Sequence, residues 1–274
     1  MAKSRIALSL VTFAIATVGG LALLGAQSSS GGQTSPDFSG VYYPVNPFGA
    51  APGGRGAAAA APAPAAAPGR GGALPAPTRS APLSDGSRGR SADAPQLTPA
   101  YLKRWEAMRD SRIAGSYDSD NVFKCLPPGM PAMMNMAYGM EVMQTKDKIT
   151  FFSELNDALR RVYLDGRKPP PEILDDPTYA GYSTGRWEGD TLVVDTVALR
   201  DNTFIEGFTP HSERMTIRER IRFVEPGLLE DQITVTDPEA LLKPWETVKR
   251  YRKASYPNDQ LREFACAEGM EHVK

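Results

Sequence analysis

Glu219 occupies the position in this sequence that most clearly suggests chemistry. It lies between Ile217 and Ile221 on the apolar face of an alternating run whose other face carries threonine and arginines. A carboxylate on such a face must be paired, hydrogen-bonded or protonated. One hypothesis is a buried ion pair that fixes strand register, with Arg161 or Arg250 as the partner. The other is a polar group aimed into a cavity, where it binds a ligand or acts as a general acid or base.

Ser183 is a second catalytic candidate, because residues 181–185 read Gly-Tyr-Ser-Thr-Gly and match the G-x-S-x-G nucleophile elbow. An elbow needs a strand that turns sharply into a helix, whereas this motif continues into a predicted hairpin. An aspartate and then His211 follow in chain order, so a serine triad remains an alternative. The triplet His211-Ser212-Glu213 is interpreted either as turn chemistry or as a site at the rim of the domain.

Cys125 and Cys266 lie near the two ends of the predicted β domain. A disulfide between them would close a long loop and contribute about 4 to 5 kcal/mol in the chain-entropy model; two separate buried thiols are the alternative. The sequence has no Cys-x-x-Cys pair and two distant histidines, His211 and His272. It therefore predicts no cofactor and no thiolate or histidine metal centre, and it leaves an all-carboxylate calcium site open without a D-x-D-x-D-G loop to support one.

The elements that must position these residues are mainly strands. From residue 149 onward, alternating runs separated by turn residues predict about eight strands with short connections. Such a series favours an antiparallel meander that closes into a small barrel or a strongly curved sheet. One N-terminal helix is expected, with Thr98 as its N-cap and Pro99 at its first position.

A barrel of about eight strands can hold one small ligand or be filled by its own side chains. The favoured function is therefore the binding of a small, partly apolar ligand. An enzyme in the same barrel and a tethered scaffold of the cell envelope are the alternatives. Six methionines between residues 130 and 143 suggest either an adaptable surface or a core plug. The polar and aromatic candidates for lining the ligand site are Glu154, Arg161, Tyr163, Trp187, His211 and Glu219.

The N-terminal third has the features of an exported protein. Lys3 and Arg5 precede an apolar run that ends in small residues, which is typical of a signal peptide over residues 1–26, with an uncleaved membrane anchor as the alternative. We expect a periplasmic or secreted protein whose membrane contact is limited to an uncleaved leader. The further boundaries are a short segment with the first strand at 27–45, a disordered Ala/Pro/Gly-rich linker at 46–96, the β domain at 97–268 and a tail at 269–274.

Charge argues against a nucleic-acid partner. Residues 1–98 carry seven basic and three acidic residues, a net charge of +4, so the rest of the chain carries about −5 of the total of −1. Nucleic acid requires clustered positive charge, which a mildly acidic domain does not offer. Composition leaves the oligomeric state open.

Several motifs resemble an uncharacterised family of exported, β-rich bacterial proteins. They are Arg-Val-Tyr-Leu-Asp-Gly-Arg at 161–167, Gly-Arg-Trp-Glu-Gly-Asp-Thr-Leu-Val-Val-Asp-Thr at 185–196, His-Ser-Glu at 211–213, Asp-Pro at 237–238 and Pro-Trp at 244–245. The resemblance covers roughly residues 36–44 and 97–268; the long linker and the sequence after Cys266 depart from it. It implies export and a β fold, and no activity. Gly40-Val41-Tyr42 is similar to the Gly-x-Trp of lipocalin-like barrels, an analogy of fold alone.

Overall fold

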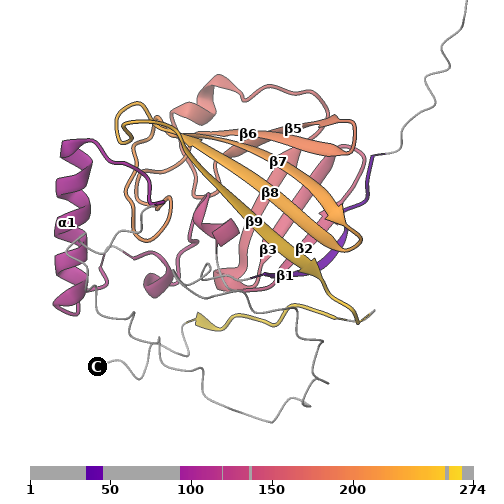
Figure 1. Ribbon diagram of the computed structural model, residues 1–274, viewed down its shortest axis with the longest axis horizontal. Helices are drawn as coiled ribbons and strands as arrows, with labels where there is room; N and C mark the ends of the chain where they lie inside the picture. The colour runs from indigo at the N-terminus through magenta and orange to yellow at the C-terminus, as the bar shows by residue number, and fades with distance from the viewer. Residues whose placement is uncertain (1–34, 46–92, 119, 136–137, 257–258, 267–274) are drawn as a thin grey trace, which may run out of the picture. The chain divides into compact units, whose positions relative to one another are not determined.

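Nine strands, following one another in chain order, form a closed barrel in the computed structural model (Figure 1). The structure describes residues 35–45, 93–118, 120–135, 138–256 and 259–266. The predicted leader at 1–26, most of the predicted linker and the tail at 269–274 lie outside these residues. The strands are β1 Gly40–Pro44, β2 Met140–Gln144, β3 Lys148–Ser153, β4 Ala158–Tyr163, β5 Tyr182–Glu188, β6 Thr191–Val197, β7 Thr216–Glu225, β8 Leu228–Thr236 and β9 Trp245–Lys253.

The mainly β class and the barrel closure are confirmed, but the expected strand count of about eight is wrong. An odd number of strands cannot alternate in direction all the way around a closed barrel. The structure resolves this with one parallel pair, β4 and β5, while every other neighbouring pair, including β1 with β9, is antiparallel. A parallel pair needs a crossover rather than a hairpin. Residues 164–181 supply it and contain the short 3-10 helix Pro171–Leu174.

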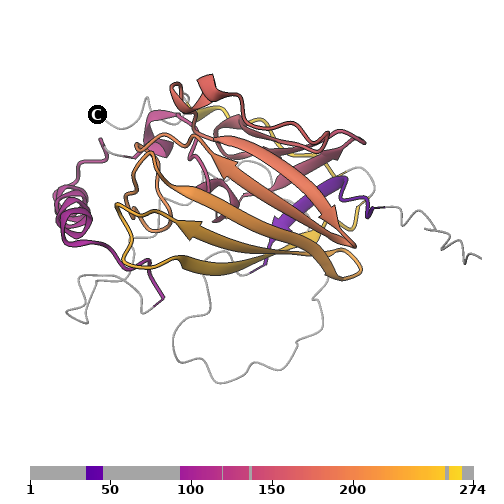
Figure 2. The same cartoon turned by 90° about the horizontal axis from the view of Figure 1, so that it is seen from above.

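The predicted helix forms as α1, Pro99–Ile113, with Thr98 at the N-cap and proline in the first turn. It follows β1 in the chain and is therefore not N-terminal to the strands. Figures 1 and 2 place it beside one end of the barrel. There the buried Trp105 donates from its indole nitrogen to the carbonyl of Gly207, 3.5 Å away.

The segment before α1 is hydrogen-bonded to residues at and just before the start of β9. The indole of Trp245 donates to the carbonyl of Asp93 at 2.6 Å, and the amide of Leu242 donates to the carbonyl of Gln96 at 2.8 Å. Residues 93–96, assigned above to the end of the linker, thus contact the barrel directly.

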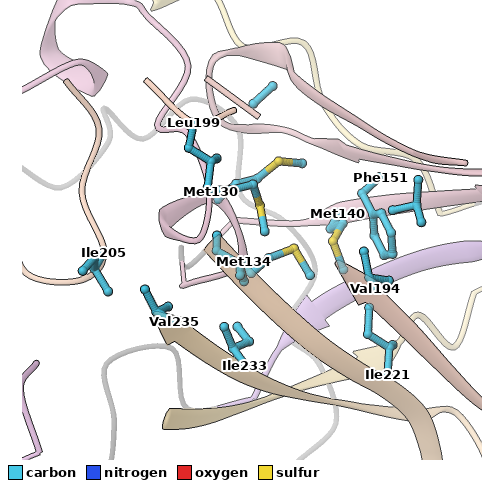
Figure 3. Packing of buried hydrophobic residues seen from close by; sticks show 14 of the residues in the cluster. Met130, Met134, Met140, Phe151, Val194, Leu199, Ile205, Ile221, Ile233 and Val235 are labelled. Carbon is cyan, nitrogen blue, oxygen red and sulfur yellow. The ribbon is translucent and has the colours of Figure 1, made fainter. Parts of the chain in front are cut away.

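The barrel interior is filled by side chains. Met130, Met133 and Met134 are buried with the strand residues Phe151 and Ile233, and Figure 3 shows Met130 and Met134 among the core side chains. The short 3-10 helix Ala132–Asn135 carries two of these methionines. Of the two interpretations of the methionine-rich segment, a core plug is the one that these buried side chains match.

The predicted disulfide is confirmed. Cys125 and Cys266 are joined, with their Cα atoms 5.6 Å apart. Two further 3-10 helices, Val122–Lys124 and Leu155–Asp157, lie in the connections before β2 and β4. The disulfide therefore ties the end of the described chain to the segment that leads into the plug.

Candidate functional site

The interior of the barrel contains one buried polar hub, centred on Arg160 of β4. Its Nη1 donates to Glu219 Oε1 at 2.7 Å and its Nη2 donates to Glu219 Oε2, while both side chains are fully buried. Its Nε donates to Ser183 Oγ at 3.1 Å, and Nη2 also donates to Thr196 Oγ1 at 3.1 Å. One guanidinium thus links β4 to β5, β6 and β7.

The partner of Glu219 is therefore Arg160. The prediction that Arg161 or Arg250 is the partner is wrong. Side chains alternate between the two faces of a strand. In β4 this alternation sends Arg160 inward and leaves Arg161 exposed on the outer face. Arg250 lies on the outer face of β9 and donates to Glu230 at 2.9 Å.

Ser183 is a hydrogen-bonding member of this hub. It lies in the middle of an extended strand, and its hydroxyl contacts Arg160 and, at 2.8 Å, the hydroxyl of Thr196. His211 has other partners: Nδ1 lies 2.8 Å from the carbonyl of Ser212, and Nε2 lies 2.7 Å from Thr203 Oγ1. The elbow geometry that G-x-S-x-G requires is therefore absent at Ser183, and in the described part of the chain no hydrogen bond joins Ser183 to His211.

The His211 ring is neutral and structural in character. Burial lowers the pKa of its imidazole. Because a carbonyl can only accept, we assign the ring proton of neutral His211 to Nδ1, which leaves Nε2 as an acceptor. The single proton of the Thr203 hydroxyl then goes to Nε2 and not to the carbonyl of Arg200, which lies 3.0 Å from the same oxygen. Next to it, the carboxylate of Asp237 accepts from the amide and hydroxyl of Ser212 at 2.7 and 2.8 Å. The His-Ser-Glu and Asp-Pro motifs therefore fasten two loops together, which matches the turn interpretation.

Asp231 of β8 is a buried carboxyl that the sequence reading did not select. Neither of its oxygens has a hydrogen-bond partner among the described residues. Burial raises its pKa well above the usual value, and the nearby Glu219 carboxylate raises it further. The strand register sets Asp231 opposite Lys249, whose ammonium lies 3.3 Å from Glu206 Oε1. Burial and the Glu219 carboxylate thus both favour the protonated form of Asp231, which can share its proton with Glu219 beside the hub.

A cleft of about 540 Å³ opens on the outer side of the barrel at the parallel pair. β4 and β5 pair only through Val162 with Ser183 and Tyr163 with Thr184. Residues 158–161 therefore have no strand partner on the β5 side. The cleft lies between this part of β4 and the crossover; its other lining residues are Pro127, Gly129, Met133, Asp157, Ile173, Thr178, Tyr179, Ala180, Gly181 and Tyr182.

Two of the sequence candidates meet in this cleft, Arg161 and Tyr163. Arg161 is exposed and, among the described residues, makes no ion pair or hydrogen bond. The Tyr163 ring packs against Tyr182, with ring centroids 5.2 Å apart. The guanidinium of Arg167 lies over the same ring, 4.2 Å from its centre.

The remaining lining candidates lie elsewhere. Glu154 accepts from the amide of Arg262 at 3.1 Å. Trp187 packs on Phe38, with ring centroids 5.2 Å apart, and His211 and Glu219 are enclosed in the contacts described above. The sequence reading missed Tyr179, Tyr182 and Asp157. The alternating pattern of residues 157–163 could have indicated the wall of the cleft that β4 forms. The crossover, which forms the opposite wall, has no such pattern.

Fold and cleft together define a closed antiparallel barrel with one parallel seam and a lateral opening. No family model and no curated protein matches the chain, so the family resemblance remains a prediction. Crystal structures of the fluorescent protein UnaG, the wild type and two point mutants, are similar at 16% identity. They cover 50% of this chain and 89% of UnaG, with TM-scores of 0.26 for the wild type and 0.27 for the mutants.

Two further properties concern the described residues alone. Among their helices, none combines the length and apolar character that crossing a membrane requires. Within the same ranges, no three His, Cys, Asp or Glu side chains are grouped as a metal site. The disulfide indicates an oxidising location outside the cytoplasm.

Proposed function

We propose that this protein is an exported, periplasmic binding protein that holds a small, partly apolar ligand in the lateral cleft. The observation that carries the proposal is the cleft itself, about 540 Å³ in volume and lined by tyrosines and one unpaired guanidinium. Ligand sites are typically concave and apolar with a few polar groups that fix orientation, and their volumes begin near 300 Å³.

The cleft is favoured over the barrel interior because the interior is occupied. Arg160, Phe151 and Met134 are among the largest fully buried side chains, and Figure 3 shows Phe151 and Met134 in the packed interior. A ligand there would have to displace packed side chains and the hub. In the cleft, Leu159 and Arg161 are exposed and the tyrosines are half-buried, so a ligand displaces no core side chain.

Export is supported by the disulfide and by the leader-like sequence at residues 1–26. The Ser183 and His211 hydrolase and the Glu219 acid/base catalyst have less support, since those groups are bound to structural partners. A probe needs access to a nucleophile, so a serine-directed phosphonate should leave Ser183 unlabelled in the folded chain.

Native mass spectrometry tests the proposal. The full chain is produced with its own N-terminus in an export-competent bacterial host and purified without reductant. We expect an added mass that is lost on denaturation and is absent from Ala180→Trp, which fills the cleft with an indole. The matched control is Ala100→Trp, on the exposed first turn of α1. An added mass that Ala180→Trp retains, or a bare chain in every sample and in a screen of envelope metabolites, contradicts cleft binding.

A further inference from the structure

The charges of the cleft are arranged along one wall. Asp157 and Arg161 are the only charged side chains among its described lining residues. They flank Leu159, and Tyr163 follows. At every second position this row therefore holds, in order, an acidic, an apolar, a basic and an aromatic residue. Outward-facing residues of a strand recur with this period of two, and both Leu159 and Arg161 are exposed on the outer face of β4.

Both charges are available to a ligand. Neither Asp157 nor Arg161 has a hydrogen-bond or ion-pair partner within the described part of the chain. The neighbouring guanidiniums are engaged: Arg167 donates to Asp165 at 2.8 Å, and Arg200 donates to the carbonyl of Pro177 at 2.8 Å. The cleft therefore presents one free carboxylate and one free guanidinium.

The backbone holds Asp157 in place at a conformational cost. Asn156 and Asp157 are consecutive non-glycine residues with positive φ, 51° and 49°. Such residues persist where the surroundings fix them, and they are concentrated at functional sites. Here the side-chain amide of Asn156 donates to the carbonyl of Leu126 at 2.8 Å and to that of Val122 at 3.3 Å. The acidic end of the row is thus anchored to the segment next to the disulfide.

The opposite wall is uncharged. Ile173, Tyr179 and Tyr182 come from the crossover or the first residue of β5 and contribute apolar and aromatic surface. At one end the walls meet, since Tyr182 packs on Tyr163. A ligand in the rest of the cleft would meet apolar and aromatic surface on one side and the charged row on the other. Asp157 precedes β4 and Arg161 lies within it, so the four residue steps between them set an upper limit of about 13 Å on the separation of their Cα atoms. Two linked aromatic rings fall within that reach.

We propose that the cleft takes an elongated dipolar ligand, with a basic group at Asp157, an apolar or aromatic middle over Leu159 and an acidic group at Arg161. This inference rests on the proposed function and names the chemical class of its ligand. A peptide-like zwitterion and an aromatic amino acid with separated charges share this chemistry.

Four matched probes test the class by calorimetry on the full chain. They are a para-linked aminomethyl-biphenyl-carboxylic acid, its methyl ester, its N-acetyl derivative and the N-acetyl methyl ester. The first carries both charges, the second only the cation, the third only the anion and the fourth neither. Exposed ion pairs are worth little each, so we expect the dipolar probe to bind about two- to fivefold more tightly than either singly charged one.

Arg161→Gln and Asp157→Asn then separate the two ends. Arg161→Gln should abolish the advantage of the dipolar probe over its methyl ester and keep its advantage over the N-acetyl derivative. Asp157→Asn should do the reverse, and asparagine suits the positive φ at this position. Equal binding of all four probes, or preferences that neither variant changes, would overturn the dipolar class.

The outcomes also distinguish the two proposals. If none of the probes binds while Ala180→Trp removes a native ligand mass, the dipolar class fails and cleft binding stands. If none binds and no ligand mass depends on Ala180, both fail.

Discussion

Arg160 and Glu219 form a bidentate ion pair in which both side chains are fully excluded from solvent. The pair joins β4 to β7 across the interior. The same guanidinium reaches Ser183 of β5, at the seam where only two residue pairs connect β4 and β5. Arg160 therefore helps to hold β4 and β5 together from inside the barrel, where their parallel pairing is short.

Removing Arg160 should strongly destabilise the protein. Arg160→Met leaves the Glu219 carboxylate buried without its partner, and breaking such a pair costs about 3 to 5 kcal/mol. The measurement is the free energy of unfolding in urea. Arg161→Met, one residue along and exposed, is the matched control and should change stability by about 0.5 kcal/mol or less.

A second substitution sharpens this test. In Arg160→Met with Glu219→Leu the uncompensated charge is gone, so much of the lost stability should return. If Arg160→Met alone is as stable as the parent chain, the pair does not hold the seam.

Asp231→Asn should increase stability at neutral pH and have little effect near pH 4. The pKa of Asp231 is raised in the folded state, by burial first and by the Glu219 carboxylate second. The folded state therefore keeps a proton that the unfolded chain releases above about pH 4. Stability falls as pH rises from that value to the folded-state pKa and then stays level.

Asparagine removes this pH-dependent loss because it has no proton to release. Urea unfolding of both chains from pH 4 to pH 8 checks the prediction. If the stabilities of the parent chain and the variant differ by a constant amount over that range, the pKa of Asp231 is not raised in the folded state.

Gly181→Ala should destabilise the protein and deform the cleft. Gly181 lines the cleft at φ 66°, and an added Cβ would lie 2.7 Å from the carbonyl oxygen of Val197 and 2.8 Å from Leu199 Cδ2. Gly189→Ala is a matched control, since its φ is 65° and no atom lies within 4 Å of an added Cβ.

Both variants bear the cost of the left-handed conformation, about 1 to 2 kcal/mol. Gly181→Ala should lose a further 1 to 3 kcal/mol, roughly, from overpacking. Equal thermal unfolding temperatures for the two variants would show that the close approach at Gly181 is not maintained in solution.

Reduction of the disulfide should lower the free energy of unfolding by about 4 to 5 kcal/mol in the chain-entropy model. The bridge closes a loop between residues 141 positions apart, and longer loops gain more from cross-linking. Urea unfolding with and without reductant measures the difference. The double variant Cys125→Ser with Cys266→Ser is the control and should not respond to reductant. If reductant also leaves the free energy of unfolding of the parent chain unchanged, the disulfide does not stabilise the protein.

Local patterns predicted the strands and the helix start at Thr98, because these depend on residue spacing and type within a short stretch. The disulfide was predicted from the leader-like sequence, which implies an oxidising compartment. The partner of Glu219 could not be predicted in this way. The choice between Arg160 and Arg161 depends on the inward face of β4, and a shift of one residue reverses that face. The cleft was also beyond reach, since it arises from the direction of β5 relative to β4. An odd strand count requires a parallel pair somewhere in the closed barrel, and no local motif indicates that β4 and β5 form it.

The pairing of β1 with β9 has a consequence for biosynthesis. Tyr43 lies opposite Arg252, so the first described strand meets its last neighbour only when nearly the whole chain has emerged. A ribosome, or a translocation channel, delivers the remaining strands before the circle can close. Folding dominated by such distant contacts is slow. We expect the barrel to stay open, with the edges of β1 and β8 unpaired, until β9 is released.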